Sequence, residues 1–372
     1  MSSTNSSMLK SLVLIFLSFT ILTVVRSQIT YYTITGIVKD GAGKTPLQGA
    51  SVYAENTTLG TATDADGKFY LSLPNGGYNL IVSFTGYNTT DIRVSNATAA
   101  SPLEIELSIK EKALQEVAIV SNNEVKNGWD KYGKFFLDEF IGTTPQAAAC
   151  SVKNPETLKF YYSKRKNRLK VLAAEPLLIE NNALGYTIKY ELDSFVHEYN
   201  ATATIYTGYP LFEEINTIDT ILSNRWQKAR EEVYFGSLLH FMRSLYRQQL
   251  KEDGFEIQWQ VLMAGKDSMI ELKDYYLSLG TSFNDGHTLM YLQPKEKITG
   301  ILYKDAVPDA AYLQENKDAP ASFQFSTLKL LSDEKLIIES NGFFFDPNEV
   351  SIADYWEWCK MANTLPFDYW PK

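Results

Sequence analysis

Apolar and polar residues alternate in short runs along the first third of the chain. The runs at 33–38, 69–73 and 103–107 alternate with a period of two, and 49–54 and 78–84 have the composition of further strands. Such alternation is typical of a strand that buries one face and exposes the other. Strands that recur about every ten residues, separated by Asp-Gly and Gly-Gly turns, predict an antiparallel β-sandwich.

In the remainder of the chain, apolar residues recur at helical spacing in some segments and at strand spacing in others. A helical pattern covers 129–141, and strand patterns then follow at 158–162, 169–173, 185–192 and 202–209. From residue 225 the period becomes helical again, in a run that is poor in Gly and Pro and reaches Gly254. This apolar stripe predicts one long amphipathic helix lying on a sheet, with Gly254 as its stop signal.

Strand patterns return after that helix, at 255–261, 287–292, 323–331 and 336–339. The tail from 352 to 370 is aromatic and predicts a closing helix followed by an extended end. We therefore predict a C-terminal α+β domain, with an antiparallel sheet and the one long amphipathic helix, over residues 128–372. Residues 29–110 are the predicted sandwich, and 111–127 are a connector.

The first 27 residues have the pattern of a secretory signal peptide. Lys10 supplies positive charge, residues 11–25 are uncharged and mostly apolar, and a short segment ending at Ser27 suits cleavage. The apolar run is shorter than the about 20 residues that a spanning helix needs. The alternative is an uncleaved N-terminal anchor. Cleavage would export a mature chain in which no later stretch is apolar enough to cross a bilayer as a helix.

Composition excludes several classes of function. The net charge of −9 argues against nucleic-acid binding, which normally needs a basic patch. With two Cys and three His in 372 residues, a zinc site is hard to assemble, and we predict no metal and no cofactor. In an exported protein, Cys150 and Cys359 could form a disulfide, or both could be buried free thiols.

The sandwich region carries motifs that are specific to one family. It resembles the carboxypeptidase regulatory-like domain, which is common in envelope proteins of Bacteroidetes-type bacteria. This resemblance implies a seven-stranded, transthyretin-like sandwich. The matching motifs are Gly36-x-Val38, Pro46-Leu47-x-Gly49-Ala50-x-Val52, Gly60-Thr61-x-Thr63-Asp64-x-Asp66-Gly67-x-Phe69, Gly77-Tyr78 and Ser83-x-x-Gly86-Tyr87.

Two activities associated with such sandwiches are not expected here. A metallocarboxypeptidase needs a His and a Glu close in sequence and a distant His, but His197-Glu198 has no matching histidine, and His240 and His287 are isolated. Residues 114–120 resemble the stretch that follows this sandwich in TonB-dependent outer-membrane transporters. A barrel of about 22 strands, each about ten residues long, would need nearly all of the chain after Val120, before any plug or loop.

The C-terminal region is similar to a Bacteroidetes envelope family in which the same sandwich precedes a region of unassigned function. That resemblance implies no activity. Its matching segments are Phe140-Ile141-Gly142-Thr143, Cys150-x-x-x-Asn154-Pro155-Glu156, Glu175-Pro176-Leu177-x-Ile179-x-Asn181, Leu184-Gly185-Tyr186-x-Ile188-x-Tyr190-x-Leu192, Trp226-x-x-x-Arg230-x-x-x-Tyr234-x-Gly236-Ser237 and His240-Phe241-x-Arg243-Ser244-Leu245.

The polar residues of the predicted long helix are the candidate functional cluster. They are Arg230, Ser237, His240 and Arg243. Ser237 and His240 are three residues apart and could touch, but a nucleophile–base pair would also need an orienting acid and an oxyanion hole. The alternative is a structural role, in which the polar side chains pair with acids or backbone carbonyls. Separately, four aromatic residues could stack on sugars, namely Tyr206, Tyr209, Trp356 and Trp358.

These observations predict an exported, non-catalytic envelope protein that binds a protein or glycan partner. The sandwich would be a docking or spacer module, and the protein would lie in the periplasm or at the outer membrane or cell surface. The alternative is a hydrolase that acts on envelope or dietary polymers, with its site on the Arg230–Arg243 helix.

Overall fold

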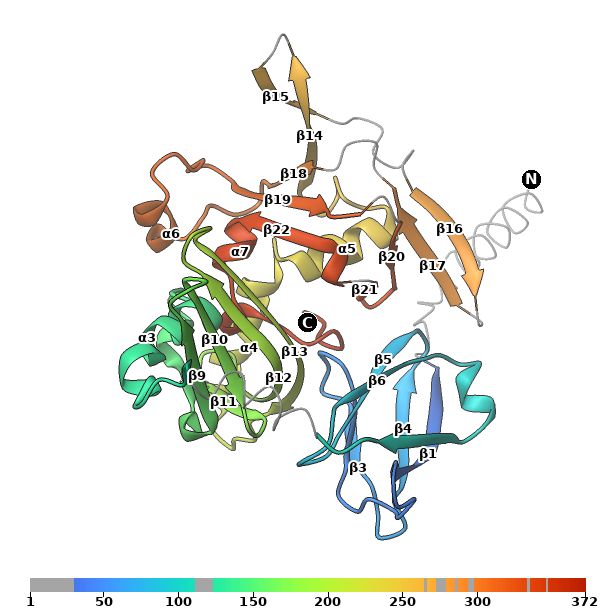
Figure 1. The fold of residues 1–372 in the computed structure, drawn as a ribbon. Coiled ribbons are helices and arrows are strands. Elements are labelled where there is room, and N and C mark those ends of the chain that lie inside the picture. The colour runs from blue at the N-terminus through green and yellow to red at the C-terminus, as the bar shows by residue number, and fades with distance from the viewer. Residues whose placement is uncertain are drawn as a thin grey trace, which may run out of the picture. The chain divides into compact units, whose positions relative to one another are not determined.

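Seven strands at the start of the described chain form two sheets in the computed structural model (Figure 1). The three-stranded sheet has the order β4–β1–β7 and the four-stranded sheet the order β3–β2–β5–β6. Their bounds are β1 Tyr31–Asp40, β2 Ser51–Ala54, β3 Gly60–Ala62, β4 Lys68–Pro74, β5 Tyr78–Ser83, β6 Thr90–Val94 and β7 Leu103–Leu107. A short 3-10 helix, η1 (Thr98–Ala100), precedes β7.

One buried apolar cluster joins the two sheets. Ile34 and Phe69 of the first sheet and Val52 and Leu80 of the second belong to it, and each is 2% exposed or less. β1 and β7 run parallel, so the prediction of a purely antiparallel sandwich is wrong for this pair. β7 follows a strand of the other sheet, and its direction is therefore not set by a hairpin turn.

The structure describes residues 30–110 and 123–372, apart from 264–265, 272–278, 285–286, 294–297, 333–334 and 346. The predicted signal peptide at 1–27 and the strand-like piece of the connector at 114–120 lie outside the described residues. Tyr32–Lys372 forms one compact unit. The predicted boundary between residues 110 and 128 therefore remains a prediction.

A six-stranded sheet forms the first part of the C-terminal region. Its order is β8–β11–β12–β10–β9, and β13 pairs with the other side of β12. All of these pairings are antiparallel. The bounds are β8 Cys150–Val152, β9 Leu158–Ser163, β10 Arg168–Ala173, β11 Leu177–Asn181, β12 Tyr186–Glu198 and β13 Ala203–Glu214, with the 3-10 helices η3 (Ala147–Ala149) and η4 (Pro155–Thr157) between them.

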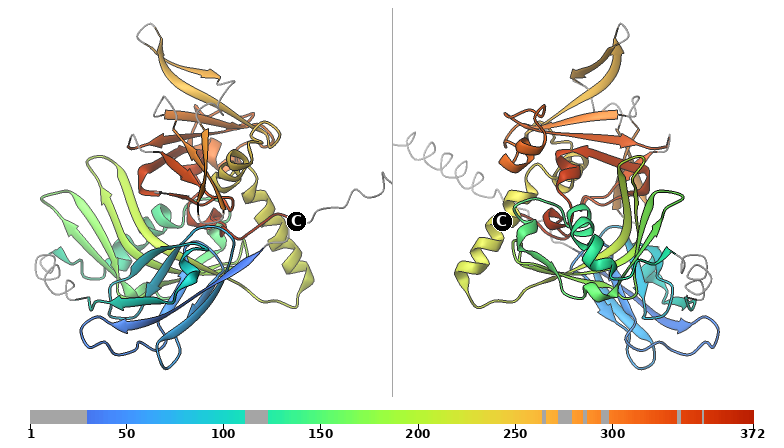
Figure 2. Two further views of the ribbon diagram at one scale, coloured as in Figure 1. Left: turned by 90° about the vertical axis from the view of Figure 1, so that its right-hand side faces the viewer. Right: turned by 60° about the vertical axis from the view of Figure 1, so that its left-hand side comes forward.

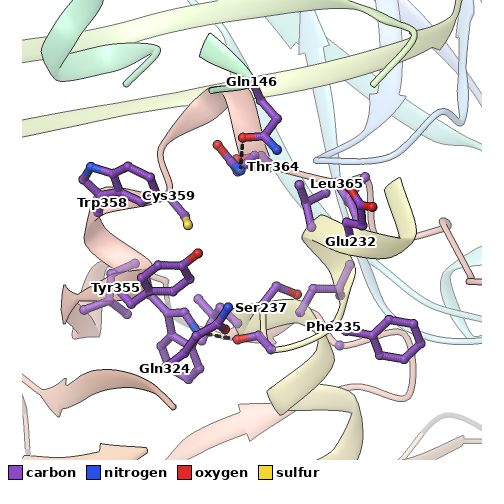
Figure 3. Close-up of a pocket in the computed structure, with 18 of the residues that line it drawn as sticks. Gln146, Glu232, Phe235, Ser237, Gln324, Tyr355, Trp358, Cys359, Thr364 and Leu365 are labelled. Atoms are coloured by element: carbon purple, nitrogen blue, oxygen red, sulfur yellow. Dashed lines mark hydrogen bonds between the residues drawn. The ribbon is translucent and has the colours of Figure 1, made fainter. Parts of the chain in front are cut away.

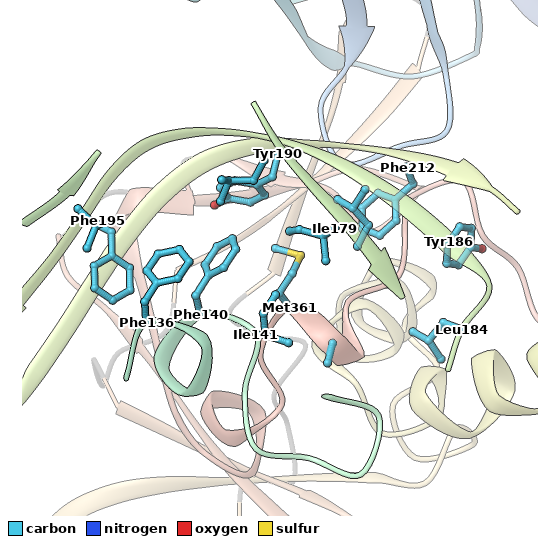
Figure 4. Close-up of a cluster of buried hydrophobic side chains, with 14 of the residues drawn as sticks. Phe136, Phe140, Ile141, Ile179, Leu184, Tyr186, Tyr190, Phe195, Phe212 and Met361 are labelled. Carbon is cyan, nitrogen blue, oxygen red and sulfur yellow. The ribbon is translucent and has the colours of Figure 1, made fainter. Parts of the chain in front are cut away.

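Helix α3 (Gly128–Phe140), which the sequence predicted at 129–141, packs on this sheet. Its residues Phe136 and Phe140 are fully buried and face Phe195 and Tyr190 of β12, with ring centroids 4.9 Å apart in both pairs (Figure 4). Alternation along β12 places one apolar face toward the helix, and burial of that face holds the two elements together.

The predicted long helix is wrong: the structure has two helices, α4 (Thr220–Tyr234) and α5 (Leu238–Arg247). Figures 1 and 2 show them as separate helices with a turn between them. Gly236 in that turn has φ +83°, a left-handed conformation in which a helix ends. Ser237 then caps α5, because its hydroxyl accepts a hydrogen bond from the backbone N–H of His240 at 3.1 Å.

Two further antiparallel sheets complete the C-terminal region. The orders are β15–β14–β18–β19–β22 and β16–β17–β20–β21. Helix α5 shares a buried cluster with both sheets, through residues such as Phe241 and Leu245. The bounds are β14 Phe255–Met263, β15 Lys266–Glu271, β16 Leu279–Asn284, β17 His287–Leu292, β18 Ile298–Tyr303, β19 Gln324–Leu330, β20 Leu336–Ile338, β21 Phe344–Phe345 and β22 Val350–Asp354.

The last elements of the chain are short. They are α6 (Ala310–Glu315), η6 (Pro347–Glu349), α7 (Tyr355–Trp358) and η7 (Met361–Asn363). Taken together, the described chain is mostly β-structure with several antiparallel sheets and few helices, which confirms the coarse prediction of fold class.

Candidate functional site

Ser237 and His240 lie at the break between α4 and α5, and each contacts backbone of the same turn. The Ser237 hydroxyl accepts from the His240 N–H, and the Gly236 N–H donates to His240 Nδ1 at 3.2 Å. The second ring nitrogen, Nε2, lies 4.0 Å from Asp253 Oδ2. A general base needs a lone pair aimed at its substrate, but the lone pair of Nδ1 is engaged by Gly236.

His240 lies among aromatic rings. The ring centroids of Tyr234 and Phe255 are both 4.9 Å from that of the imidazole, and only 4% of the residue is exposed. This burial lowers the pKa of His240 to about 4, although the Asp253 carboxylate opposes the shift. The imidazole is therefore neutral at pH 7, which fits an Nδ1 that accepts a hydrogen bond.

Arg230 of α4 contacts the strands of the first C-terminal sheet. Its guanidinium donates from Nε to the Leu184 carbonyl at 2.7 Å and from an Nη to the Gly185 carbonyl at 3.0 Å. The guanidinium carbon lies 3.9 Å from the centre of the Tyr186 ring, and the other Nη lies 3.2 Å from Glu214. Arg230 thus fixes α4 to the turn that precedes β12.

Arg243 of α5 is completely buried and holds the C-terminal tail. It donates to the carbonyls of Asn341, Tyr369 and Phe367 at 2.9, 2.7 and 3.0 Å, respectively. Its guanidinium carbon lies 3.7 Å from the centre of the Trp370 ring. Three carbonyl acceptors and an aromatic face satisfy a buried cation that would otherwise be costly.

The tail in turn contacts the hairpin turn between β2 and β3. The Phe367 N–H donates to the Asn56 carbonyl at 2.7 Å. The Asp368 carboxylate accepts from both the backbone N–H and the hydroxyl of Thr58. Arg243 therefore stabilises a chain of contacts that runs from α5 through the tail to the N-terminal sandwich.

A cavity of about 450 Å³ opens beside the α4–α5 break (Figure 3). This volume lies within the about 300–1,000 Å³ that is usual for small-molecule sites. Most of the lining residues come from residues 232–239 around the α4–α5 turn, from α7 and from residues 359–367. The lining residues with polar side chains are Asn56, Gln146, Glu232, Ser237, Asp309, Gln324, Tyr355, Cys359, Asn363 and Thr364.

Two of the polar groups that line the cavity have raised pKa values. In Figure 3, the Tyr355 hydroxyl and the Cys359 sulfur point into the cavity from the same side. Burial raises the pKa of Cys359 to about 12 and, as the largest cause, raises that of Tyr355 well above its ordinary value. Both groups therefore remain protonated at neutral pH, and a protonated thiol is a poor nucleophile.

Both cysteines carry free thiols in the structure. Cys359 lines the cavity. Cys150 is the first residue of β8, and its sulfur lies 3.5 Å from the Gln146 carbonyl oxygen. Burial raises the pKa of Cys150 to about 12 as well.

The structure brings together only part of the predicted cluster. Of the four residues, Ser237 alone lines the cavity, while the other three bind backbone or acidic groups around it. Among the predicted sugar-stacking aromatics, Trp356 and Trp358 line the cavity, but Tyr206 packs against Phe140, and Tyr209 packs against the buried cluster of Tyr53, Ile81 and Leu211. No motif in the sequence pointed to the other polar residues of the lining except Cys359, namely Asn56, Gln146, Glu232, Asp309, Gln324, Tyr355, Asn363 and Thr364.

Metal-ligand clusters and membrane-spanning helices are both absent from the described residues. Among them, no group of three or more His, Cys, Asp or Glu side chains could hold a metal ion. No helix in the same described part is long and apolar enough to cross a bilayer.

Residues 34–119 match the family model described as CarboxypepD_reg-like domain. The curated relatives are receptors. TonB-dependent receptor SusC of Bacteroides thetaiotaomicron is 38% identical over 94 residues, which are 25% of this chain and 9% of the receptor. TonB-dependent receptor P39 of Formosa agariphila is 31% identical over 116 residues, which are 31% of this chain and 10% of the receptor.

The chain therefore spans only about a tenth of these relatives' own length. A solved structure of a membrane-associated protein of unknown function from Bacteroides fragilis aligns with 83% of this chain and 94% of that chain, at 11% identity. The TM-score of 0.17 is too low to establish a shared fold.

These matches confirm the predicted resemblance to Bacteroidetes-type envelope proteins that begin with this sandwich. All but one of the residues that line the cavity lie beyond the matched segment, the exception being Asn56. Residues 34–119 of this chain are thus similar to a CarboxypepD_reg-like domain, and the cavity belongs mainly to the region that follows this segment.

Proposed function

We propose that this chain is an exported, non-catalytic envelope protein that binds a partner molecule in the cavity beside the α4–α5 break. The observation that carries the proposal is the cavity itself, whose volume of about 450 Å³ suits a ligand. The groups around it do not form a nucleophile–base pair: the Ser237 hydroxyl accepts from the backbone N–H of His240 and not from its ring, and Nδ1 of His240 accepts from Gly236.

The proposed organisation follows from the matches and from the sequence pattern. Residues 1–27 act as a cleaved signal peptide, and the mature protein lies in the periplasm or at the cell surface. Residues 29–110 form a transthyretin-like sandwich that docks or spaces the C-terminal region at 128–372. The similarity of this sandwich to a segment of TonB-dependent receptors supports an envelope location.

Ligand binding can be tested by filling the cavity. Leu238 and Val307 both line it, and Val307 is 64% exposed, so a larger side chain there does not disturb a core. We expect Leu238→Trp and Val307→Trp to abolish binding of oligosaccharides and peptides released from the envelope, as followed by native mass spectrometry of the full chain. Ile221→Trp is the control, because Ile221 is 80% exposed on α4 and does not line the cavity.

The same samples test the hydrolase alternative. Binding of intact ligand by the wild type and by Ile221→Trp, but by neither cavity variant, would support the proposal. Shortening of an envelope or dietary polymer that both cavity variants prevent would contradict it and favour a hydrolase. Equal binding by all four proteins would place the ligand elsewhere.

A further inference from the structure

We propose that the ligand of this cavity is an uncharged, short oligosaccharide, an inference that rests on the function proposed above. The charge of the lining disfavours an anionic ligand. Among the described residues that line the cavity, Glu232 and Asp309 are acidic and none is a lysine, arginine or histidine. A phosphate or carboxylate group would lose its hydration there and meet two carboxylates, with no cation to compensate.

The two carboxylates also do not favour a cationic ligand. Glu232 lies 3.6 Å from the ammonium group of Lys228, one turn earlier on α4. Asp309 caps α6, where its carboxylate accepts from the Ala311 N–H at 2.7 Å. A ligand amine would therefore compete with partners that these acids already have, which leaves an uncharged ligand as the best match.

The remaining polar groups suit hydroxyl groups. Gln146, Gln324 and Asn363 carry side-chain amides, each with two N–H donors and a carbonyl acceptor that can bond to sugar hydroxyls. Part of this capacity is used within the protein, because Asn363 donates to the Gln146 carbonyl oxygen at 3.2 Å and Gln324 donates to the Val307 backbone carbonyl at 3.4 Å. One bond does not exhaust an amide, so each can bond to a ligand as well. The Ser237 hydroxyl accepts a hydrogen bond from the backbone N–H of His240. The hydroxyl proton of Ser237 takes no part in that bond and can be donated to a ligand. These groups can satisfy a ring of hydroxyls without any charge.

Aromatic rings provide the apolar part of the site. Tyr355 and Trp358 both line the cavity, with ring centroids 5.7 Å apart and an interplanar angle of 32°. The Trp358 ring is fixed, because its Nε1–H donates to Glu315 at 3.1 Å. Flat rings held in place are suited to the apolar C–H faces of pyranose sugars, while amides nearby meet the hydroxyls.

A peptide is a poorer match to the same lining. Extended peptides gain affinity from main-chain hydrogen bonds along the edge of a sheet. Here the strands contribute single side chains, from Gln324 of β19, Phe344 of β21 and Ile352 of β22, and not a run of backbone groups. The other lining residues come from helices, from the segments beside them, and from two hairpin turns that contribute Asn56 and Gly342.

The test measures the affinity of the full chain for matched probes by calorimetry. The N-acetylglucosamine trimer is compared with the cationic glucosamine trimer, a galactose trimer with the acidic galacturonic acid trimer, and an uncharged tripeptide is included. We expect at least one neutral trimer to bind at least about tenfold more tightly than its charged counterpart, which corresponds to about 1.4 kcal/mol. Trp358→Leu should weaken that binding by a similar factor.

A charge variant sharpens the test. Glu232→Gln should improve binding of the galacturonic acid trimer several-fold and leave the neutral trimers unchanged, whereas Glu231→Gln, on the same helix but outside the lining, should change neither. If a charged trimer or only the tripeptide binds, and Val307→Trp abolishes that binding, the ligand class is wrong and the proposed function stands. If no probe binds and envelope extracts yield no ligand either, both proposals fail.

Discussion

The N-terminal sandwich and the C-terminal region are stabilised in different ways. The sandwich buries an apolar cluster between its two sheets, including Val52, Leu80 and Phe69. The C-terminal region has apolar cores as well, but it also buries the ionisable side chains of Arg243 and His240, which bind backbone carbonyl and amide groups around the cavity. The buried polar residues of the sandwich are small and uncharged, such as Thr63. Buried polar groups impose a specific geometry, since each unsatisfied partner is costly. The difference suggests that the sandwich serves as scaffold and the C-terminal region as binding site.

The largest effect is expected from Arg243→Ala. This change removes a fully buried side chain, leaves three partly buried carbonyls without their donor, and should lower the free energy of unfolding by about 3–5 kcal/mol. Arg247→Ala is the matched control on the same helix, because Arg247 is partly exposed and pairs with Asp253. It should cost less than about 1 kcal/mol. Urea unfolding measures both, and equal losses would refute the role of Arg243 as a buried anchor.

Gly236→Ala should have the next largest effect, and Gly86→Ala in the sandwich is its comparison. The two glycines have φ +83° and φ +86°, so both variants carry the cost of a left-handed alanine, about 1 kcal/mol. A Cβ at Gly236 would lie 2.5 Å from Gln324 and 2.6 Å from Tyr303, whereas at Gly86 it meets nothing within 4 Å. We expect a loss of about 3 kcal/mol at Gly236. Equal unfolding free energies for the two variants would contradict the close packing of Gln324 and Tyr303 around Gly236.

Stability should depend on pH through His240. Its pKa is lowered from 6.5 to about 4, so the unfolded chain binds a proton at higher pH than the folded chain does. The free energy of unfolding should therefore fall as the pH drops from about 6.5 to about 4, by at most about 3 kcal/mol. His240→Asn can keep an acceptor for Gly236 but does not titrate. The difference between the two pH profiles should be confined to that range, and parallel profiles would show that His240 is not buried as described.

The smallest effect is expected from Ser237→Ala. Loss of the cap should cost about 1 kcal/mol, close to the cost of Asp219→Ala at the start of α4, where Asp219 accepts from the N–H groups of Ile221 and Leu222. Ser237→Asp should restore most of the stability in thermal unfolding. If it does not, the hydroxyl has a role other than capping.

The sequence predicted the strands of the sandwich well because each strand is a short alternating run and the turns between strands carry characteristic residues. Gly67, for example, has φ +73° and would place a Cβ 2.5 Å from the Val38 carbonyl. The pattern also located α3 and the long antiparallel pair of β12 and β13. It did not reveal the parallel pairing of β1 with β7, because strand direction between distant segments leaves no local signal.

The sequence does contain a signal for the break between α4 and α5, but the helical spacing of apolar residues continues across it. Gly236 followed by Ser237 is a typical helix stop followed by a typical helix start. The apolar stripe continues across both helices, and it suggested one element. The cavity could not be predicted in the same way, since Gln146, Asp309 and Tyr355 are far apart in sequence and meet only through the pairing of several sheets.

Hydrogen–deuterium exchange of the full chain, with and without the neutral trimer that binds most tightly, tests the central claim most directly. We predict slower exchange at residues 235–241 and 355–367, which surround the cavity, and unchanged exchange in the sandwich core at 49–54 and 78–83. Slower exchange confined to the sandwich, with none around the cavity, would contradict it.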